Sequence, residues 1–484
     1  MKDLSRQDLF KQQAYINGQW LDADSGETLN VTNPANGEVL GTIPNMGAAE
    51  THRAIEAAEK AQKLWRAKSA KERAVIMRNW FELVMENQDD LALIMTLEQG
   101  KPLAEARGEI AYGASYLEWY AEEGKRAYGD VIPGPASDRR VIVTKEPVGV
   151  CAAITPWNFP AAMITRKVGA ALGAGCSIVV KPAAETPYSA FALCVLAEEA
   201  GVPSGLVSVV TGSASEIGKE MTSNSIVRKL SFTGSTEVGR ILMSQCSDQI
   251  KKVSLELGGN APFIVFNDAD LDAAVEGAMM SKYRNAGQTC VCANRIYVQD
   301  EIYDAFAEKF VAAVNQIKVG DGTVEGVNQG PLIDEAAVTK VQDHIADALS
   351  KGAKVATGGK PHSLGGLFFE PTVVTEVTSE MKVAREETFG PLAPLFRFKT
   401  EEEVVQMANN TEYGLAAYFY SRDIGRVWRV AEALEYGMVA INNGILSNEA
   451  APFGGVKQSG IGREGAKYGL DDYMVIKYML IGGI

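Results

Sequence analysis

The strongest constraint on the fold of this chain is a regular alternation of short apolar runs with amphipathic segments that begins near Val148. The runs predict strands at 150–154, 177–181, 206–210, 229–232 and 252–256, and the intervening segments predict helices near 160–173, 187–200, 213–222 and 236–247. Strands that alternate with helices form a parallel sheet, because each helix is the crossover between two strands. The alternation therefore predicts a doubly wound, Rossmann-like unit of the kind that binds dinucleotides.

The residues before this alternation carry other patterns. Ala14–Leu21 alternates around an Asn17-Gly18 turn, which predicts a β-hairpin because both turn residues tolerate positive φ. Residues 48–127 have helical spacing, with a helix restart expected at Pro102. Residues 130–150 become strand-like again.

A second α/β series follows Gly258 and Gly259. It begins with the apolar run 263–266 and a helical segment at 271–282, and it continues to about residue 440. The tail, 472–479, alternates like an edge strand or a strand between subunits. The chain is therefore expected to be α/β, with a doubly wound Rossmann-like unit, a second α/β unit and a small β element.

Composition limits the partners of this chain. Its 484 residues suggest about three domain-sized units, and the formal net charge of −14 argues against nucleic acid and anionic membrane surfaces as partners. No apolar stretch approaches a membrane span, and the charged N-terminus lacks the apolar core of a signal peptide. Six scattered cysteines do not form a disulfide framework. The expected location is the cytoplasm, with reduced thiols.

Histidine is scarce. His52, His344 and His362 are the only three, and we expect all of them to be solvated surface residues. Three histidines are too few to favour a histidine-based zinc site or a Cys–His dyad, so no metal site is expected. Any general base is then a carboxylate.

Three segments far apart in the chain carry a thiol, a carboxylate and a side-chain amide. Cys290 ends the polar run 283–290, Glu256 ends a predicted strand, and Asn158 follows a Pro-Trp pair. A thiolate adds to a carbonyl, an amide N–H holds the oxyanion that forms, and a carboxylate activates water. This set fits the oxidation of an aldehyde through a thioester.

Each of these residues also has an ordinary interpretation. A buried cysteine is usually a small apolar side chain. That interpretation fits Cys151, Cys176, Cys194 and Cys246. An Asn after a strand is usually a turn residue, and a Glu at a strand end is usually solvated. Cys290 differs because the polar, glycine-containing run that precedes it does not have the pattern of a core strand. Cys292 is expected to pack nearby and is a candidate for a reversible disulfide with Cys290.

Together the three segments resemble the aldehyde dehydrogenase superfamily, and the resemblance extends from about residue 14 to about residue 480. Within it the chain looks most like the succinate-semialdehyde dehydrogenases, by residues 162–167, 284–292 and 445–447. The resemblance implies oxidation of an aldehyde with NAD(P)+ as hydride acceptor. It makes Cys290 the nucleophile, Asn158 and the Cys290 N–H the oxyanion donors, and Glu256 the general base. Relatives that pass the acyl group to coenzyme A lack this glutamate, so a free acid product is expected.

The resemblance also implies three functional parts. Residues 1–129 and 151–257 are expected to form the cofactor-binding domain, and residues 258–457 the catalytic domain. Residues 130–150 and 458–484 are expected to form an oligomerisation element of a homotetramer, a dimer of dimers. Exposed edges at both of these last segments would favour association.

The cofactor residues follow from the same resemblance. Gly234 and Ser235 open a helix after a strand, where backbone N–H groups approach a pyrophosphate. Lys181 is expected to hold the adenosine ribose. Ala184 stands where NAD-specific relatives commonly have a glutamate, so NADP is expected, with NAD possible. The full expected set is Thr155, Pro156, Trp157, Lys181, Ala184, Gly234, Ser235, Leu257, Glu387 and Phe389, with Glu387 at the nicotinamide ribose and Phe389 beside the ring.

Two arginines and a serine point to the substrate. A substrate with a free carboxylate needs a cationic clamp, and guanidinium groups of Arg166 and Arg284 offer paired hydrogen bonds. Ser447 would add a third donor. This favours succinate semialdehyde. Either arginine is alternatively a structural ion pair. Glutarate semialdehyde, an uncharged aliphatic aldehyde, and a non-catalytic scaffold protein are the other interpretations.

Overall fold

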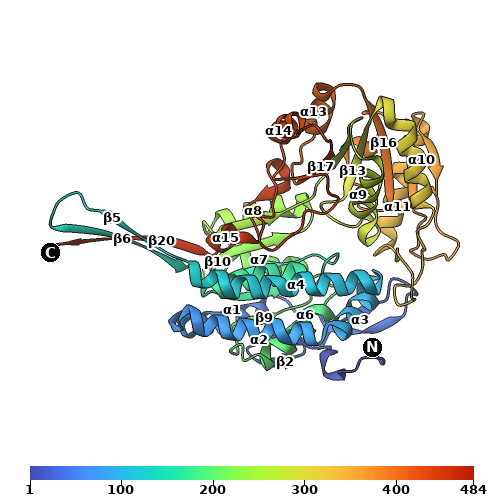
Figure 1. The fold of residues 1–484 in the computed structure, drawn as a ribbon. Helices are drawn as coiled ribbons and strands as arrows, with labels where there is room; N and C mark the ends of the chain where they lie inside the picture. Colours follow the sequence, from blue (N-terminus) through green and yellow to red (C-terminus); the bar gives the residue numbers. More distant parts are fainter.

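The computed structural model describes residues 1–484 and contains two α/β units and a three-stranded arm that projects from them (Figure 1). The first unit is built on an eight-stranded sheet in the order β19-β11-β10-β7-β8-β9-β1-β2. Its strands are β1 (Ala14–Ile16), β2 (Gln19–Leu21), β7 (Val150–Ile154), β8 (Ser177–Lys181), β9 (Val207–Val209), β10 (Val227–Thr233), β11 (Lys252–Glu256) and β19 (Gly460–Ile461). Strands β7 to β11 are mutually parallel, as the strand–helix alternation predicts.

Helices cover both faces of this sheet. They are α1 (Ala48–Ala67), α2 (Ala70–Glu86), α3 (Gln88–Gln99), α4 (Leu103–Glu123), α5 (Ala162–Ala174), α6 (Tyr188–Glu199), α7 (Ala214–Ser223) and α8 (Thr236–Ser247). Alternate side chains of β8 pack into two different hydrophobic clusters. Ile178 and Val180 pack in the cluster that contains residues of α2 to α6, whereas Val179 packs in the cluster that contains residues of α1, α7 and α8. The predicted doubly wound arrangement is therefore confirmed, as are the hairpin at Asn17-Gly18 and the helix restart at Pro102.

The second unit is built on a seven-stranded sheet in the order β14-β15-β16-β13-β12-β17-β18. Its strands are β12 (Ala261–Val265), β13 (Ala293–Gln299), β14 (Lys354–Thr357), β15 (Thr372–Thr375), β16 (Leu392–Phe398), β17 (Ala416–Tyr420) and β18 (Met438–Ile441). Its helices are α9 (Leu271–Tyr283), α10 (Tyr303–Val314), α11 (Glu335–Ser350), α12 (Lys382–Arg385), α13 (Glu401–Asn409) and α14 (Ile424–Ala433). The predicted strand at 263–266 and helix at 271–282 are β12 and α9.

The two sheets present opposite ends of their strands to each other. Asn158, Gly234 and Glu256 lie at the carboxyl ends of β7, β10 and β11. Cys290 and Glu387 lie in loops that enter the amino ends of β13 and β16. Side chains from both edges line one cavity, so the loops of the two units meet there.

Close packing of α4 against α5 fixes the position of the Asn158 loop. Gly169 and Gly173 of α5 face α4, where an added Cβ would lie 3.0 Å from the Tyr116 carbonyl oxygen and 2.9 Å from the Tyr120 carbonyl oxygen. Glycine at these two positions lets the helices approach closely. Helix α5 therefore begins at a fixed place beside α4, directly after the Asn158 loop.

The arm consists of β5 (Asp130–Pro133), β6 (Arg139–Pro147) and β20 (Met474–Gly482), antiparallel in the order β20-β6-β5 (Figure 1). Several of its apolar side chains face solvent in this chain, among them Val131 at 79 %, Ile476 at 74 % and Tyr478 at 61 %. Strand β19 joins the first sheet beside β11, and α15 (Ala466–Asp471) leads from it towards β20. No helix is long and apolar enough to cross a membrane.

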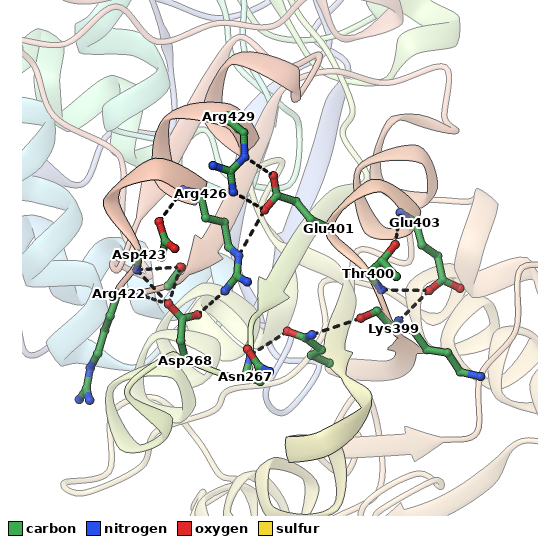
Figure 2. A network of polar contacts seen from close by, with 12 residues as sticks. Asn267, Asp268, Lys399, Thr400, Glu401, Glu403, Arg422, Asp423, Arg426 and Arg429 are labelled. Carbon is green, nitrogen blue, oxygen red and sulfur yellow. Dashed lines mark hydrogen bonds and ion pairs between the residues drawn. The ribbon is translucent and has the colours of Figure 1, made fainter.

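A polar network closes the other end of the second sheet, after β12 and β17 (Figure 2). Asp268 accepts hydrogen bonds from the Ser421 hydroxyl at 2.9 Å and from the backbone N–H groups of Arg422 and Asp423 at 2.8 and 2.9 Å. Its other oxygen pairs with Arg426 at 2.7 Å, and Arg426 continues to Glu401 at 3.3 Å. The network fastens α13 and α14 to the sheet edge away from the cavity.

This network gives a test of stability. Replacing Asp268→Ala leaves four donors without their acceptor, so the free energy of unfolding should fall by about 1–3 kcal/mol. Urea titration followed by circular dichroism measures this as a lower midpoint. Asp272→Ala, which removes an exposed ion pair with Lys309, is the control and should leave the midpoint unchanged. Equal midpoints for the two variants would contradict the assignment.

Candidate active site

A cavity of about 340 Å³ lies where the two sheet edges meet. It is lined by Pro156, Trp157, Asn158, Phe159, Met163, Thr233, Gly234, Ser235, Glu256, Leu257, Gly258, Cys290, Ala336, Ala337, Lys340, Glu387, Thr388 and Phe389. All three residues predicted to carry the chemistry, Cys290, Glu256 and Asn158, are in this set. They come from three loops separated by at least thirty residues of chain, so only the fold brings them together.

Asn158 is buried and its amide is fixed from one side. Its Nδ2 donates to the Gln288 carbonyl at 3.0 Å, which leaves the second N–H of that amide free, and its Oδ1 has no partner. The backbone oxygen of Asn158 accepts from Lys101 Nζ at 2.7 Å and from Asn285 Nδ2 at 3.0 Å. The residue is thus clamped at its backbone and at one amide hydrogen, with the remaining donor available at the cavity.

The loop that leads to Cys290 has a left-handed backbone. Asn285, Ala286 and Gly287 have φ values of 51°, 55° and 76° in succession. Such conformations cost free energy in residues other than glycine and persist where the surroundings impose them. At Gly287 an added Cβ would collide with the Gly390 carbonyl oxygen, so glycine is required there. The strained turn aims Cys290 into the cavity.

The Cys290 thiol is protonated at neutral pH in this state. Burial raises its pKa to about 12, against an opposing effect of Arg166 and of the residue's own backbone N–H. Cys290 is the only partly exposed cysteine, and the other five are buried. The expectation that Cys151, Cys176, Cys194 and Cys246 are small core residues is confirmed.

Burial also favours the neutral form of Glu256. Burial, followed by repulsion from Glu464, raises its pKa well above the ordinary glutamate value, although Arg166 and Lys167 oppose this shift. Its Oε2 is buried without a partner, and an added Cβ on Gly454 would lie 2.8 Å from its Oε1. Glu256 must be ionised to take a proton from water, and the charges of Arg166 and Lys167 favour that carboxylate form.

Aromatic and acidic side chains form the other wall of the cavity. Phe389, with φ of 56°, meets Trp157 edge to face at a centroid distance of 5.6 Å. Glu387 accepts a hydrogen bond from the Gly259 N–H at 3.1 Å, and burial raises its pKa to about 7. Ser235 caps the amino end of α8, which opens at the cavity. An aromatic slot, a carboxylate and a helix amino end in one cavity fit a nicotinamide ribose and a pyrophosphate.

Three of the predicted cofactor residues lie farther along the same sheet edge, outside this cavity. The Thr155 N–H donates to the Lys181 carbonyl oxygen at 3.0 Å, so the two residues are neighbours on β7 and β8. Lys181 is buried, and burial lowers its pKa against the opposing effect of Glu185. Thr155 Oγ1 is buried without a partner. Ala184 packs partly against the core and offers no polar group.

The expectation that all histidines are solvated is wrong for His344. Its side chain is fully buried between α11 and the segment before β16, with Nδ1 3.1 Å from the Thr388 hydroxyl and Nε2 3.1 Å from Glu386. Helical spacing placed His344 on a helix but did not show which segment covers that helix. Its two contacts lie on either side of Glu387 in the chain.

A second pocket lies beside the two chain neighbours of Cys290. Arg284 and Ser447 share a narrow pocket with Thr289 and Val291, the two chain neighbours of Cys290. Arg284 also lines a wider outer pocket of about 450 Å³. Cys290 lines the aromatic cavity, and its two chain neighbours line the pocket that contains Arg284 and Ser447.

Arg166 has a different environment from Arg284. Arg166 Nε lies 2.8 Å from Glu464 Oε2, and the guanidinium stacks on Phe453 with its carbon 4.0 Å from the ring centroid. The structural ion pair that was left open for either arginine is thus present at Arg166, although its Nη2 is buried without a partner. Arg284 pairs with no carboxylate and rests on Phe159 at 4.8 Å.

The sequence missed the buried charges around the site. Lys167 donates to the Thr233 hydroxyl at 2.8 Å and pairs with Glu464, while Lys101 pairs with Glu109 at 2.5 Å. Lys167 follows Arg166 directly, yet its partner lies almost three hundred residues away. No local pattern identifies such pairs. The only signal was a charged residue within an otherwise apolar stretch.

Comparison with known proteins identifies the class that this fold and site define. Residues 20–479 match the model of the aldehyde dehydrogenase family. The chain belongs to the aldehyde dehydrogenase family, and it is an oxidoreductase whose family uses NAD(P)+.

Several well-described relatives are similar to this chain over its whole length. Glutarate-semialdehyde dehydrogenase of Pseudomonas aeruginosa is 68% identical over 98% of this chain and 99% of the relative. Succinate-semialdehyde dehydrogenase (NADP(+)) of Escherichia coli is 68% identical over 99% of both chains. 3-Sulfolactaldehyde dehydrogenase of Pseudomonas putida is 65% identical over 100% of both. These three names share the reaction class and differ in the aldehyde.

The state of Cys290 gives a test of the site. Because its pKa is raised to about 12, the thiolate fraction in the protein without cofactor should grow about tenfold per pH unit from about pH 7 to about pH 10. Iodoacetamide alkylation, followed by mass spectrometry of the peptide, measures this as a rate that rises without a plateau. Cys290→Ser is the control and should abolish the label. A plateau below about pH 9 would show that the thiol is not held neutral.

Proposed function

We propose that this aldehyde dehydrogenase oxidises succinate semialdehyde to succinate, with NADP+ as hydride acceptor. The observation that carries the proposal is the free guanidinium of Arg284 beside Ser447, in the pocket that adjoins Cys290. A buried or half-buried cation without a carboxylate partner is costly unless a ligand supplies the opposite charge. A short aldehyde with a terminal carboxylate fits that requirement.

The first chemical step forms a bond between the Cys290 sulfur and the aldehyde carbon. The thiol gives its proton to solvent water before the attack, and the nearby Arg166 charge favours the thiolate. The carbonyl oxygen becomes an oxyanion, which the free N–H of Asn158 and the Cys290 backbone N–H stabilise. Donors already fixed in place need no reorganisation when the charge appears.

The remaining steps release the acid. Bound NADP+ would supply the hydride acceptor, with Glu387 at its ribose and Phe389 and Trp157 beside its ring. Loss of the hydride from the thiohemiacetal carbon leaves a thioester on Cys290. Glu256 first gives up its own proton to solvent, as the nearby Arg166 and Lys167 charges favour. The carboxylate then takes a proton from a water molecule, the water oxygen attacks the thioester carbon, and the Cys290 thiolate leaves. Succinate is the product.

NADP+ is proposed over NAD+ because of the edge of the sheet after β8. Ala184 offers no carboxylate to repel a 2′-phosphate or to bind the ribose hydroxyls, while Lys181 supplies a cation nearby. The Escherichia coli relative carries NADP(+) in its name. Glu185 is exposed next to Ala184, so NAD+ remains a weaker acceptor in the proposal.

Glutarate semialdehyde is the second candidate. The Pseudomonas aeruginosa relative bears that name at 68% identity. The aldehydes in the names of the succinate, glutarate and 3-sulfolactaldehyde relatives all carry an anionic group away from the carbonyl. This shared charge supports Arg284 as an anion clamp. The outer pocket of about 450 Å³ has room for a chain longer by one carbon.

We also propose that the chain forms a homotetramer and works in the cytoplasm. The exposed apolar side chains of β5 and β20 support association, because the edges and faces of a projecting sheet are otherwise unprotected. Six unpaired cysteines support a reducing location. The three functional parts expected from the sequence, at 1–129 with 151–257, at 258–457 and at 130–150 with 458–484, are retained in this proposal.

The substrate proposal is tested with initial rates of NADPH and NADH formation on succinate semialdehyde, glutarate semialdehyde and butanal. Arg284→Ala should lower kcat/KM for the better semialdehyde about 100-fold, because it removes a charge-assisted contact, and should change butanal by less than about twofold. Arg422→Ala, an exposed arginine beyond the far sheet edge, is the control and should leave all rates unchanged. Equal losses on the charged and uncharged aldehydes would overturn the clamp.

The association proposal is tested by charge substitution on the arm. The double variant Ile476→Glu/Tyr478→Glu should shift the mass measured by light scattering from about four chains to fewer, because it places carboxylates on an apolar face. Lys477→Ala, on the opposite face of β20, is the control and should keep the native mass. A native mass of one chain, 52.0 kDa, would refute association.

A further inference from the structure

One face of α4, together with Lys101 two residues before the helix, lies against the loop that carries Asn158. Lys101 and Glu109 are both buried and form an ion pair at 2.5 Å. Lys101 Nζ also donates to the Asn158 backbone oxygen at 2.7 Å and lies 4.1 Å from the ring centroid of Phe159. The ammonium therefore holds the backbone of the residue whose side chain is the proposed oxyanion donor.

Glu109 holds the same loop at its other end. Its Oε1 accepts from the N–H groups of Ala161 at 3.0 Å and Ala162 at 3.2 Å. These groups open helix α5, where backbone donors have no partner within the helix. Glu109 thus serves as a cap supplied by a neighbouring helix. Together with Lys101 it fixes the Asn158 loop on both sides.

Glu105 lies between them in the chain, four residues from each, and shares one face of α4 with Glu109. Its Oε2 accepts from the Asn285 N–H at 2.8 Å, within the left-handed turn that leads to Cys290. Asn285 Nδ2 in turn donates to the backbone oxygen of Asn158 at 3.0 Å. Lys101, Glu105 and Glu109 therefore contact both the loop that carries Asn158 and the turn that leads to Cys290.

We propose that Lys101, Glu105 and Glu109 are positioning residues that set the Asn158 amide against the Cys290 sulfur. The inference rests on the proposed roles of Asn158 and Cys290. None of the three lines the cavity that holds Cys290, although Glu105 lines the outer pocket with Arg284. All three contact the Asn158 loop or the turn before Cys290, and they act through those loops. An oxyanion donor works only within hydrogen-bond reach of the developing charge, and a displacement of about 1 Å costs about 100-fold in rate.

The ionic character of these three residues agrees with a positioning role. A buried ion pair adds little to stability compared with apolar side chains of similar volume. It does impose direction, because each charge satisfies defined donors and acceptors. Here Lys101 donates to the Asn158 oxygen, Glu109 accepts from the start of α5, and Glu105 accepts from the Asn285 N–H.

The test is a double-mutant cycle between Lys101→Met and Asn158→Ala, measured by the pre-steady-state burst of NADPH, with kcat and KM from steady-state rates. Lys101→Met should slow the burst and lower kcat about 100-fold, and should change KM by less than about threefold. The double variant should be no slower than Asn158→Ala alone, because Lys101 acts through Asn158. Iodoacetamide labelling of Cys290, which needs no oxyanion donor, should change by less than about twofold.

Substitutions of Glu105 provide a second, independent test. Glu105→Gln keeps an acceptor for the Asn285 N–H and should retain kcat within about threefold, whereas Glu105→Leu removes the acceptor and should lower it more than about tenfold. A merely structural role would not be rescued by the conservative variant. Arg107→Met, on the exposed face of α4, is the matched control and should leave all readouts unchanged.

The outcomes separate the inference from the function on which it rests. If Asn158→Ala slows the burst but Lys101→Met does not, or if the two losses multiply, the positioning role is overturned and the proposed function stands. If Asn158→Ala leaves the burst unchanged, both fail. Should Lys101→Met not fold because it strands the Glu109 charge, the charge-balanced Lys101→Met/Glu109→Gln pair replaces it in the cycle, with the same expected losses.

Discussion

The site depends on hydrogen bonds between two loops that belong to different sheets. Asn158 donates from its amide to the Gln288 carbonyl, and Asn285 donates from its amide to the Asn158 carbonyl. Each loop thus satisfies a backbone oxygen of the other, in a buried place where an unpaired carbonyl would be costly. The contact fixes the distance between an amide on the first unit and a thiol on the second. The cavity, the aromatic slot and the pocket that contains Arg284 and Ser447 are arranged around it.

Burial then sets the chemistry of the groups that the loops bring together. Desolvation raises the pKa values of Cys290 and Glu256 and so favours the uncharged form of both groups. Nearby cations moderate this effect: Arg166 and Lys167 share the carboxylate of Glu464 and face Glu256. Ionisation of either group therefore becomes more favourable when solvent or a nearby cation stabilises its charge. A free, fully ionised thiolate in the resting state would be exposed to oxidants.

The sequence predicted the local structure well because periodicity and turn chemistry are local properties. β7, β8 and β11 have the predicted limits, and α4 restarts directly after Pro102. It also identified Cys290, Glu256 and Asn158, since their flanking glycines and prolines are unusual in a core. It failed for His344, whose burial depends on a segment more than forty residues away. It gave no sign of the pairing of Arg166 with Glu464, because an ion pair between distant residues leaves no periodic trace.

The sequence by itself determined that this chain is a doubly wound α/β protein with the residues of an aldehyde dehydrogenase. Those features follow from side-chain type and spacing along the chain, which local backbone geometry converts directly into strands, helices and turns. Only the tertiary structure decided that the carboxyl ends of one sheet face the amino ends of another, and that Arg166 forms an ion pair while Arg284 forms none. It alone decided that Lys101 and one face of α4 contact both the Asn158 loop and the turn before Cys290. These depend on contacts between segments that are distant in sequence, and such contacts are settled by packing, burial and charge pairing across the whole fold.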